Sequence, residues 1–492
     1  MRWKKPVVSL KILKKDVKDI TARSGKPKTS NNRPTNARLC PRISKNTPTK
    51  EGQNKPENTK TDLKPFMTIL GTSQRATLEV DCIIGDYMVK IAFFHNECAP
   101  YRMPLFEGIS KLPNIDLKVY FGRYRSSSRR WNVELNVNFN YEMLKEINAL
   151  ASLFSFNPED DPNPINPSLF FKLLSNKYDV FIGGVPHYFG TLITFLVSKI
   201  LRKPFIVFLE DIDFKGEEIA SYLKRFLNYP FWKMLAFPFI LIRFVCFQIV
   251  LRHSDGYVVP GTATKEFLLR RGISPSKIFT ALNVVDNHGI EQERKESLKR
   301  NNTEKLKEKL GLKNKKVILS VAYLLERKGL QYLIQACAKL KKEKNDFMLV
   351  IVGDGPYKQE LRRISTQNNL KTIFAGYVSN LVDYYLIADV FVLPTLHDVW
   401  GFAINEAMLC GCPIITTYNA GASKDLVKNE TNGYIIEPGN VLELYRALKS
   451  ILYNDKLKQK MKRKSEEIMQ NFSYEKSIQG YGAAIDYVLG KQ

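Results

Sequence analysis

The sequence lacks any pair of cysteines at the spacing of a zinc site. Its seven cysteines lie singly along 492 residues, and no Cys-x-x-Cys occurs. Neither a zinc finger nor a disulfide framework is therefore indicated. Scattered thiols, odd in number, are typical of a reducing compartment, so we expect free cysteines and a cytoplasmic location.

A long uncharged apolar run is also missing. The longest apolar stretch, residues 229–252, reads YPFWKMLAFPFILIRFVCFQIVLR and contains Lys233, Arg243, Gln248 and two prolines. A membrane-spanning helix needs about 20 residues with few or no charges. We therefore interpret this stretch as a buried helix or as one lying in the headgroup layer of a membrane, which would make the protein peripheral to the inner face.

Acidic side chains are scarce relative to basic ones. The chain has 75 Lys and Arg against 49 Asp and Glu, a formal net charge of +26. Such an excess attracts nucleic acid, anionic lipid or phosphorylated substrates. Because no zinc-finger spacing, RNA-binding aromatic motif or Arg-rich helix accompanies the charge, we expect no nucleic-acid partner. An anionic membrane surface stays among the expected partners.

Residues 1–87 have the composition of a disordered basic extension. They hold 19 Lys and Arg against 8 Asp and Glu, and from Thr21 to Lys64 they consist mainly of Asn, Thr, Pro, Lys, Ser and Gly. Such a segment has little to pack into a core. One hypothesis is that the natural protein starts at Met88. The other is that the basic tail touches a membrane.

From Met88 onward, short apolar runs alternate with helical patterns, as they do in parallel α/β domains. The runs are rich in Val and Ile without alternation, which indicates sheets covered on both faces. We predict strands at 89–94, 117–121, 178–184, 204–210, 256–260 and 277–283, and a second set at 316–323, 347–355, 372–376, 390–394, 413–417 and 433–438.

A highly charged stretch, residues 287–316, separates the two sets and fits a linker with a surface helix. Two doubly wound, Rossmann-like domains result, with a boundary near residue 286. Ligands of such sheets bind beyond the carboxyl ends of the strands. We therefore expect the binding site in a cleft between two facing domains.

Two strand-to-helix loops of the second set differ in what they predict. In SVAYLLERKGLQYLIQA, residues 320–336, Arg327 and Lys328 precede a helix, where free backbone N–H groups favour an anion. The alternative is a surface loop with two solvated charges. In IVGDGPYKQELRR, Lys358 replaces the third glycine of a dinucleotide fingerprint, so we interpret that loop as a structural turn.

A third loop, DVWGFAINEAMLCG at residues 398–411, carries two carboxylates inside an apolar stretch. Asp398 lies in the loop before a helix, and Glu406 lies within that helix. The helix N-terminus would seat a diphosphate, while both carboxylates could accept hydrogen bonds from sugar hydroxyls. In the alternative interpretation Asp398 caps the helix and Glu406 is an exposed helical acid.

These motifs carry a resemblance to a known family. YLLERKG, GDGP, DVWGFAINEAM and GCPIIT, in that order and spacing, resemble the C-terminal half of family 4 retaining glycosyltransferases, which have the GT-B fold. Asp398 and Glu406 match the acidic pair of that family, Glu-x7-Glu, with Asp in the first place. Residues 93–111, 260–286 and 472–489 resemble further parts of polysaccharide-type members, so the resemblance covers residues 88–490.

The resemblance implies four parts of the chain. Residues 1–87 form the extension, 88–285 an acceptor-binding domain, and 286–471 a domain that binds the nucleotide sugar. Residues 472–492 form a helix that crosses back to the first domain.

The resemblance also implies roles for individual residues. Asp398 would be the catalytic residue and would contact the donor sugar, and Glu406 would hold the ribose hydroxyls. The donor would be a UDP- or GDP-sugar that binds without a metal or another cofactor, since a cation and a helix N-terminus can stabilise the departing diphosphate. The other donor-side residues would be Lys328 and Arg327 at the diphosphate, Gly401 and Phe402 at phosphates or hydroxyls, and Tyr377 and Val378 along the base.

Some residues depart from the family pattern. Members commonly have Arg where Tyr323 stands, and many have His after the strand that ends here in Glu210 and Asp211. Residues 98–102, CAPYR, replace a Gly-Gly pair. The candidate acceptor-side residues are His95, Arg102, His187 and Glu210.

The function that the resemblance implies is transfer of a sugar, with retention, from a nucleotide sugar to a glycan or lipid-linked acceptor in polysaccharide biosynthesis. Two alternatives stay open. Another GT-B enzyme, of the epimerase type, would need no second substrate. A non-catalytic protein that binds a sugar nucleotide or glycan would bind without turnover.

Overall fold

The computed structural model describes residues 87–125, 137–147, 164–210 and 237–491. The predictions for residues 1–86, including the disordered extension with Cys40 and Cys82, lie outside the described residues. So do Asp211 and the first part of the apolar stretch, residues 229–236.

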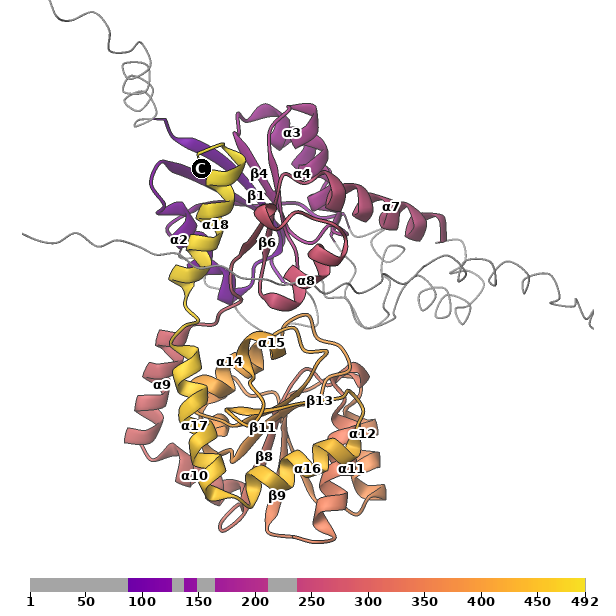
Figure 1. Cartoon of the computed structure of the whole chain (residues 1–492), viewed down its shortest axis with the longest axis vertical. Helices are drawn as coiled ribbons and strands as arrows, with labels where there is room; N and C mark the ends of the chain where they lie inside the picture. Colours follow the sequence, from indigo (N-terminus) through magenta and orange to yellow (C-terminus); the bar gives the residue numbers. More distant parts are fainter. Residues whose placement is uncertain (1–86, 126–136, 148–163, 211–236, 492) are drawn as a thin grey trace, which may run out of the picture. The chain divides into compact units, whose positions relative to one another are not determined.

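The first sheet has seven parallel strands in the order β3-β2-β1-β4-β5-β6-β7 (Figure 1). All six predicted strands of the first set are present. Sequence analysis missed β3, an edge strand of mainly polar residues, NYEM, with no apolar run to mark it. The strands are β1 (Val89–Glu97), β2 (Ile115–Arg123), β3 (Asn140–Met143), β4 (Val180–Gly183), β5 (Phe205–Phe208), β6 (Gly256–Val259) and β7 (Ile278–Thr280).

Both faces of this sheet are covered, because successive side chains of a strand point to opposite faces. Ile91 and Phe93 of β1 belong to one apolar core, and Ala92 and Phe94 to the other. The first core includes α2 (Met103–Ser110), which follows the short helix η1 (Pro100–Arg102). The second core includes α3 (Ser168–Ser175), α4 (Phe189–Ile200), α7 (Phe237–His253) and α8 (Thr262–Arg270), after which η3 (Pro275–Lys277) leads into β7.

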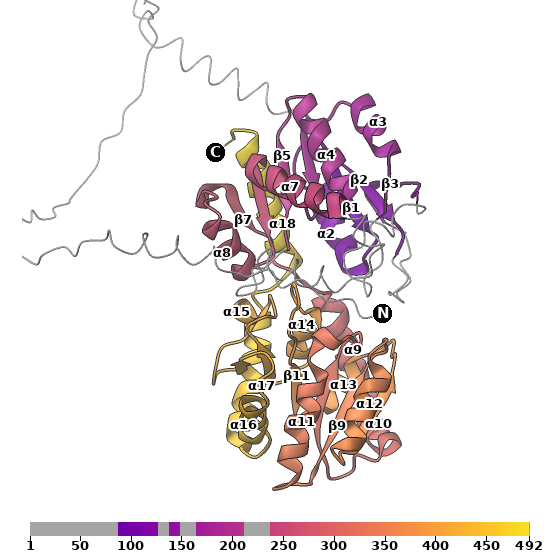
Figure 2. The same cartoon turned by 90° about the vertical axis from the view of Figure 1, so that its right-hand side faces the viewer.

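The second sheet has six parallel strands in the order β10-β9-β8-β11-β12-β13 (Figure 2). A strand lies in each of the six predicted runs of the second set. The strands are β8 (Lys316–Val321), β9 (Phe347–Val352), β10 (Thr372–Gly376), β11 (Val390–Leu393), β12 (Ile414–Thr417) and β13 (Gly433–Ile436).

Helices cover both faces of the second sheet as well. One core contains side chains from α11 (Leu330–Lys341), α12 (Lys358–Gln367) and α16 (Val441–Leu452). The other contains side chains from α13 (Val382–Ile387), α14 (Phe402–Leu409) and α15 (Ser423–Leu426). Residues of α17 (Asp455–Met469) contribute to both cores, through Met461 and Met469.

The charged stretch between the two sets of strands is more ordered than predicted. We expected one surface helix, but the structure has two, α9 (Asn287–Lys299) and α10 (Asn302–Leu310). Ile290 of α9 and Leu306 of α10 pack against the core of the second sheet. The many charges hide these few apolar contacts in the sequence.

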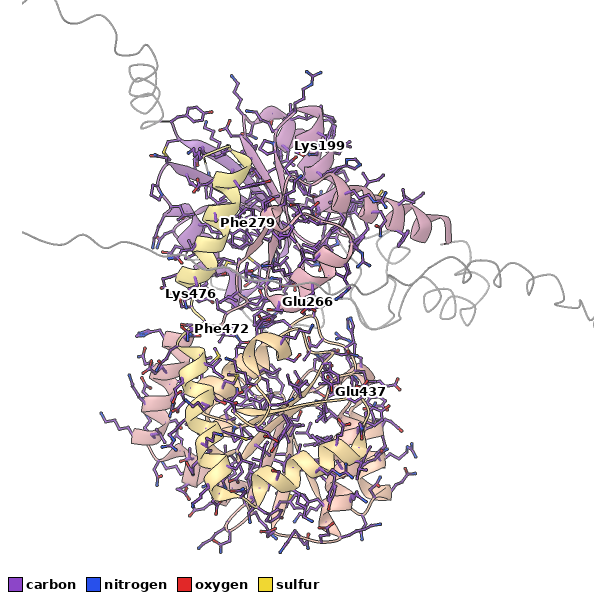
Figure 3. All side chains as sticks on the ribbon, viewed as in Figure 1. Lys199, Glu266, Phe279, Glu437, Phe472 and Lys476 are labelled. Atoms are coloured by element: carbon purple, nitrogen blue, oxygen red, sulfur yellow. The ribbon has the colours of Figure 1, made fainter. Side chains whose placement is uncertain are left out.

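The last helix, α18 (Tyr474–Val488), lies with the first sheet, as predicted for a crossing C-terminal helix (Figures 1 and 3). Tyr481, Ala484 and Ile485 belong to the same core as α2. The ring of Tyr487 packs against Phe279 of β7, with the ring centroids 5.4 Å apart. The end of the described chain therefore completes the domain at its beginning.

The helix within the apolar stretch, α7, is only partly buried over the side chains that the structure describes. Val250 and Leu251 are buried, whereas Ile242, Val245 and Ile249 are exposed. A fully buried helix is therefore the wrong interpretation for this part of the stretch, and its place in a headgroup layer stays a prediction. In the part of the chain that the structure describes, every helix is too short or too polar to cross a membrane.

Substitution of two glycines with similar backbone angles should cost different amounts of folding stability. Gly329 (φ 70°) precedes α11, and a Cβ built on it would lie 1.9 Å from the carbonyl oxygen of Pro394. Gly311 (φ 65°) ends α10, and nothing lies within 4 Å of its Cβ position. Both alanine variants lose about 1 kcal/mol to the left-handed conformation, but Gly329→Ala must also displace backbone.

We therefore expect Gly329→Ala to lower the midpoint of thermal unfolding clearly more than Gly311→Ala. Circular dichroism melts of the two variants and the wild type measure this. Equal shifts would contradict the close approach of the Gly329 and Pro394 loops.

Candidate functional site

The candidate site lies at the carboxyl edge of the second sheet. There, two neighbouring strands are followed by helices that pack on opposite faces of the sheet. β8 pairs with β11. The helix after β8, α11, packs into one core, and the helix after β11, α14, packs into the other. This is the topological switch point of a doubly wound sheet, where the two loops diverge and leave a crevice.

The loop after β8 forms the short helix η4 (Glu326–Lys328), and the loop after β11 runs from Pro394 to Gly401. Arg327 holds the second loop, since its carbonyl oxygen accepts a hydrogen bond from Leu396 N at 2.7 Å. Its guanidinium donates to His397 O at 3.1 Å. Arg327 is thus engaged with backbone of the neighbouring loop, and the alternative of a solvated surface charge is wrong for it.

Lys328 and Asp398 form an ion pair across these two loops. Lys328 Nζ lies 2.5 Å from Asp398 Oδ2, and the two side chains are 13% and 12% exposed. Burial acts to raise the pKa of the Asp398 carboxyl, but the charge and hydrogen bond of Lys328 and the charge of Arg327 outweigh it and hold the pKa below its usual value. Asp398 is therefore ionised at neutral pH.

The start of α14 has no side-chain cap. Gly401 occupies the N-cap position with φ 97°, and among the described residues this position makes no side-chain cap hydrogen bond. The alternative that Asp398 caps this helix is therefore wrong, because its carboxylate pairs with Lys328 instead. The uncapped N–H groups of a helix start favour an anion.

Glu406, one turn into α14, is partly buried. Tyr385 of α13 donates a hydrogen bond from its hydroxyl to Glu406 Oε2 at 2.7 Å. Burial, aided by the charge of Glu293, raises the pKa of the Glu406 carboxyl above its usual value despite the Tyr385 hydrogen bond. The alternative of an exposed helical acid is therefore wrong for Glu406.

The remaining donor-side candidates lie on the same side of the sheet as these loops. Tyr377 follows β10 with its ring half exposed, and Val378 packs against the core below. Phe402 lies against Tyr101 of η1, with ring centroids 4.4 Å apart. Tyr323, which stands where the family commonly has Arg, follows β8 and is partly exposed.

On the acceptor side, the structure brings together two of the four candidates. Arg102 Nη2 lies 2.6 Å from Glu210 Oε1 and also donates to Asn283 Oδ1 at 2.9 Å. The guanidinium of Arg102 lies over the ring of Phe208 and is buried. Arg102 is therefore positioned to hold Glu210 in place.

The two histidines are not part of this ion pair, although His95 is near enough to be affected by the charge of Arg102. His95 Nδ1 is 2.7 Å from Glu97 O, and burial together with the charge of Arg102 lowers the pKa of His95 to about 4. His95 is therefore neutral at physiological pH. The ring of His187 packs beside Tyr188.

A buried polar chain that sequence analysis missed connects this cluster with α14. Asn283 O accepts a hydrogen bond from Asn405 Nδ2 at 3.1 Å, and Asn405 Oδ1 accepts one from Trp400 Nε1 at 2.9 Å. Both asparagines are fully buried. The signal in the sequence was an Asn within an apolar helix, five residues after a Trp whose N–H needs an acceptor.

Two further residues of the site were also missed. Tyr385 is the fully buried hydrogen-bond donor to Glu406. His397 precedes Asp398, and its charged form would help to lower the pKa of that carboxyl. The sequence around Tyr385 shows no sign of its partner, because Glu406 comes from another element, α14.

The cysteines of the described residues are free thiols, as predicted. They are Cys98, Cys246, Cys337, Cys410 and Cys412.

The raised pKa of Glu406 predicts a pH-dependent cost in stability. A carboxyl whose pKa is higher in the folded than in the unfolded chain destabilises the fold as pH rises above the unfolded value of about 4.3. Gln at this position keeps an acceptor for Tyr385 and has no proton to lose. We expect Glu406→Gln to raise the unfolding midpoint at pH 8 and to leave it nearly unchanged at pH 4.

Thermal melts between pH 4 and pH 8 measure this difference. Glu437→Gln serves as the control, because Glu437 is an exposed acid at the end of β13 (Figure 3). If the increase in unfolding midpoint caused by Glu406→Gln did not grow with pH, ionisation of the buried Glu406 carboxyl would not be its cause.

Comparisons with known proteins identify the kind of domain that carries this site. Residues 302–468 match the family model "Glycosyl transferases group 1". A curated N-acetylgalactosaminyltransferase of Campylobacter jejuni, which acts on a diphospho-undecaprenol glycan by its name, is 29% identical over 245 residues, 49% of this chain and 60% of that protein. An uncharacterised glycosyltransferase of Haemophilus influenzae is 29% identical over 175 residues, 35% of this chain and 50% of its own length. The chain thus spans about half the length of these curated relatives.

The fold is similar to that of solved glycosyltransferase structures. Anabaena HepE in complex with UDP superimposes with a TM-score of 0.59 at 17% sequence identity, covering 81% of this chain and all of that one. Residues 302–468 are therefore similar to group 1 glycosyltransferases, and the chain has the GT-B fold of two Rossmann-like domains.

Proposed function

We propose that the protein is a retaining glycosyltransferase of family 4 that moves a sugar from a nucleoside-diphosphate sugar to a glycan or lipid-linked acceptor. The observation that carries the proposal is the Lys328–Asp398 ion pair beside the uncapped start of α14. Together they offer a cation and free N–H groups to a diphosphate, and an ionised carboxylate to a sugar.

The diphosphate would bind between Lys328 and the first N–H groups of α14, near Gly401 and Phe402. An ammonium group has three N–H donors, so Lys328 can hold Asp398 and a phosphate oxygen at the same time. Arg327 would fix the loop that carries Asp398 rather than touch the phosphates, because its guanidinium and carbonyl already bind that loop.

The nucleoside would lie toward β10, with the ribose at Glu406 and the base along Tyr377 and Val378. The Tyr385 hydrogen bond fixes one oxygen of Glu406 and leaves the other to accept from a ribose hydroxyl. We propose uracil as the base, because the HepE structures to which this fold is similar contain UDP or UDP-glucose.

The transfer step would be a front-face displacement. The bond from the anomeric carbon to the diphosphate oxygen breaks, and a bond from the acceptor oxygen forms on the same face. The acceptor's hydroxyl proton passes to the departing phosphate oxygen. Lys328 and the N–H groups of α14 stabilise the charge that develops on the diphosphate, so no metal ion is required.

Asp398 would orient the sugar by accepting hydrogen bonds from its hydroxyls. On the acceptor side, Glu210 is the candidate contact, held by Arg102 and Asn283. His95 and His187 stay candidates for the acceptor side without a specific role. The name of the Campylobacter relative supports a lipid-diphosphate-linked glycan as acceptor.

The expected effect of Lys328→Ala is a loss of transition-state stabilisation. Removal of one such donor costs about 2–3 kcal/mol, or roughly 30- to 150-fold in rate. Release of UDP from UDP-sugars in the presence of acceptor, with and without a chelator, measures it. Lys464→Ala, at an exposed ion pair of α17, is the matched control and should keep full activity.

Because Lys328→Ala leaves Asp398 buried without its partner, the unfolding midpoint of the variant must be recorded beside its rate. A folded Lys328→Ala variant with unchanged turnover would refute the assignment. Conversion of the donor without an acceptor would favour the epimerase type, and binding of UDP-sugars without any turnover would favour a non-catalytic protein.

A further inference from the structure

Exposed apolar side chains are concentrated on three neighbouring helices of the first domain. Among the described residues, 20 large apolar side chains are exposed, and nine of them lie on α3, α4 and α7. These three helices cover the same face of the first sheet and lie side by side (Figures 1 and 2). The nine are Phe171, Leu174, Phe189, Leu196, Ile200, Ile242, Phe244, Val245 and Ile249, which we name the apolar face.

On α4 the exposed residues form a stripe opposite the core. Phe189, Leu196 and Ile200 recur at helical spacing, so they share one side of the helix. Thr194 and Val197 point to the other side and are buried. A surface helix normally presents polar residues outward, so this helix is apolar on both sides.

On α7 the pattern repeats. Ile242, Val245 and Ile249 share the outward side, whereas Val250 and Leu251 are buried against the sheet. Because α4 and α7 are in contact, their exposed stripes form parts of one apolar surface. Exposed apolar patches of this kind mark interaction sites.

The charges on and beside the apolar face are mainly basic. The 37 residues of α3, α4 and α7 include no Asp or Glu but include Lys172, Lys199 and Arg252. Lys172 and Lys199 form ion pairs with Glu142 and Asp255, so Arg252 carries the argument on these helices. A hollow of about 420 Å³ at the C-terminal end of α7 is lined by Lys199, Arg252 and Lys277, with Asp255 as the only acid. Figure 3 labels Lys199 on α4.

We infer that the apolar face is a docking surface for an anionic membrane. Its aliphatic and aromatic side chains enter the boundary between headgroups and acyl chains, and Arg252 and Lys277 at its edge bind lipid phosphates. A second copy of the chain fits this face poorly, because it would bring like charges together. The inference goes beyond the proposed function, since docking requires neither donor nor transfer.

The test is co-sedimentation of the full chain with vesicles of phosphatidylcholine and phosphatidylglycerol in a 3:1 ratio, and with phosphatidylcholine alone. We expect binding to the anionic vesicles that weakens with added salt, and much less binding to the neutral ones. Ile200→Asp and Ile249→Asp should each weaken binding roughly tenfold, because each removes an inserted aliphatic side chain.

Two control variants match these positions in exposure. Leu298 of α9 is 55% exposed against 54% for Ile200, and Leu442 of α16 is 44% exposed, as is Ile249. Leu298→Asp and Leu442→Asp should bind vesicles like the wild type. Transfer to a water-soluble acceptor without vesicles should be unchanged in all four variants, which separates failure of docking from failure of the proposed function.

Three outcomes would overturn the inference. The first is no vesicle binding by the wild type, and the second is equal loss in the test and control variants. The third is a change of molar mass, or a lower unfolding midpoint, that is confined to Ile200→Asp and Ile249→Asp without any effect on vesicle binding. This third outcome would mean that another copy, or another part of the chain, covers the apolar face.

Discussion

The ion pair between Lys328 and Asp398 is the interaction on which the geometry of the site depends. The two residues are 70 positions apart in sequence, and their ion pair joins the loops that follow β8 and β11, which are neighbouring strands in the sheet. A buried carboxylate without a partner would be costly, so each residue fixes the other's loop. The pair thereby holds the start of α14 at the point where the two cores of the sheet diverge.

Asp398 and Glu406 are held in opposite electrostatic conditions, although they belong to one motif. Asp398 is stabilised as an anion by Lys328, whereas Glu406 has a burial cost that the Tyr385 hydrogen bond offsets only in part. In the proposed complex, a ribose hydroxyl would supply the missing hydrogen bond to Glu406. The burial of Glu406 that destabilises the free protein would then add to the free energy of donor binding.

The sequence predicted the strands well because parallel, doubly covered strands are uniform apolar runs, and it missed β3 because an edge strand has no such requirement. It placed Asp398, Glu406 and Lys328 in one region, since their loops follow strands of the same sheet. It could not pair Asp398 with Lys328 rather than with the helix start, nor Asn405 with Asn283. Such partners depend on register and topology, which local sequence does not carry.

The crossing of α18 has a consequence for the order in which the protein is made. Tyr481, Ala484 and Ile485 form part of the core that begins with Val89 of β1. A ribosome therefore synthesises the whole second domain before the first domain can close its own core. The second domain has no such dependence, so during synthesis it can become stable first, although its chain emerges later.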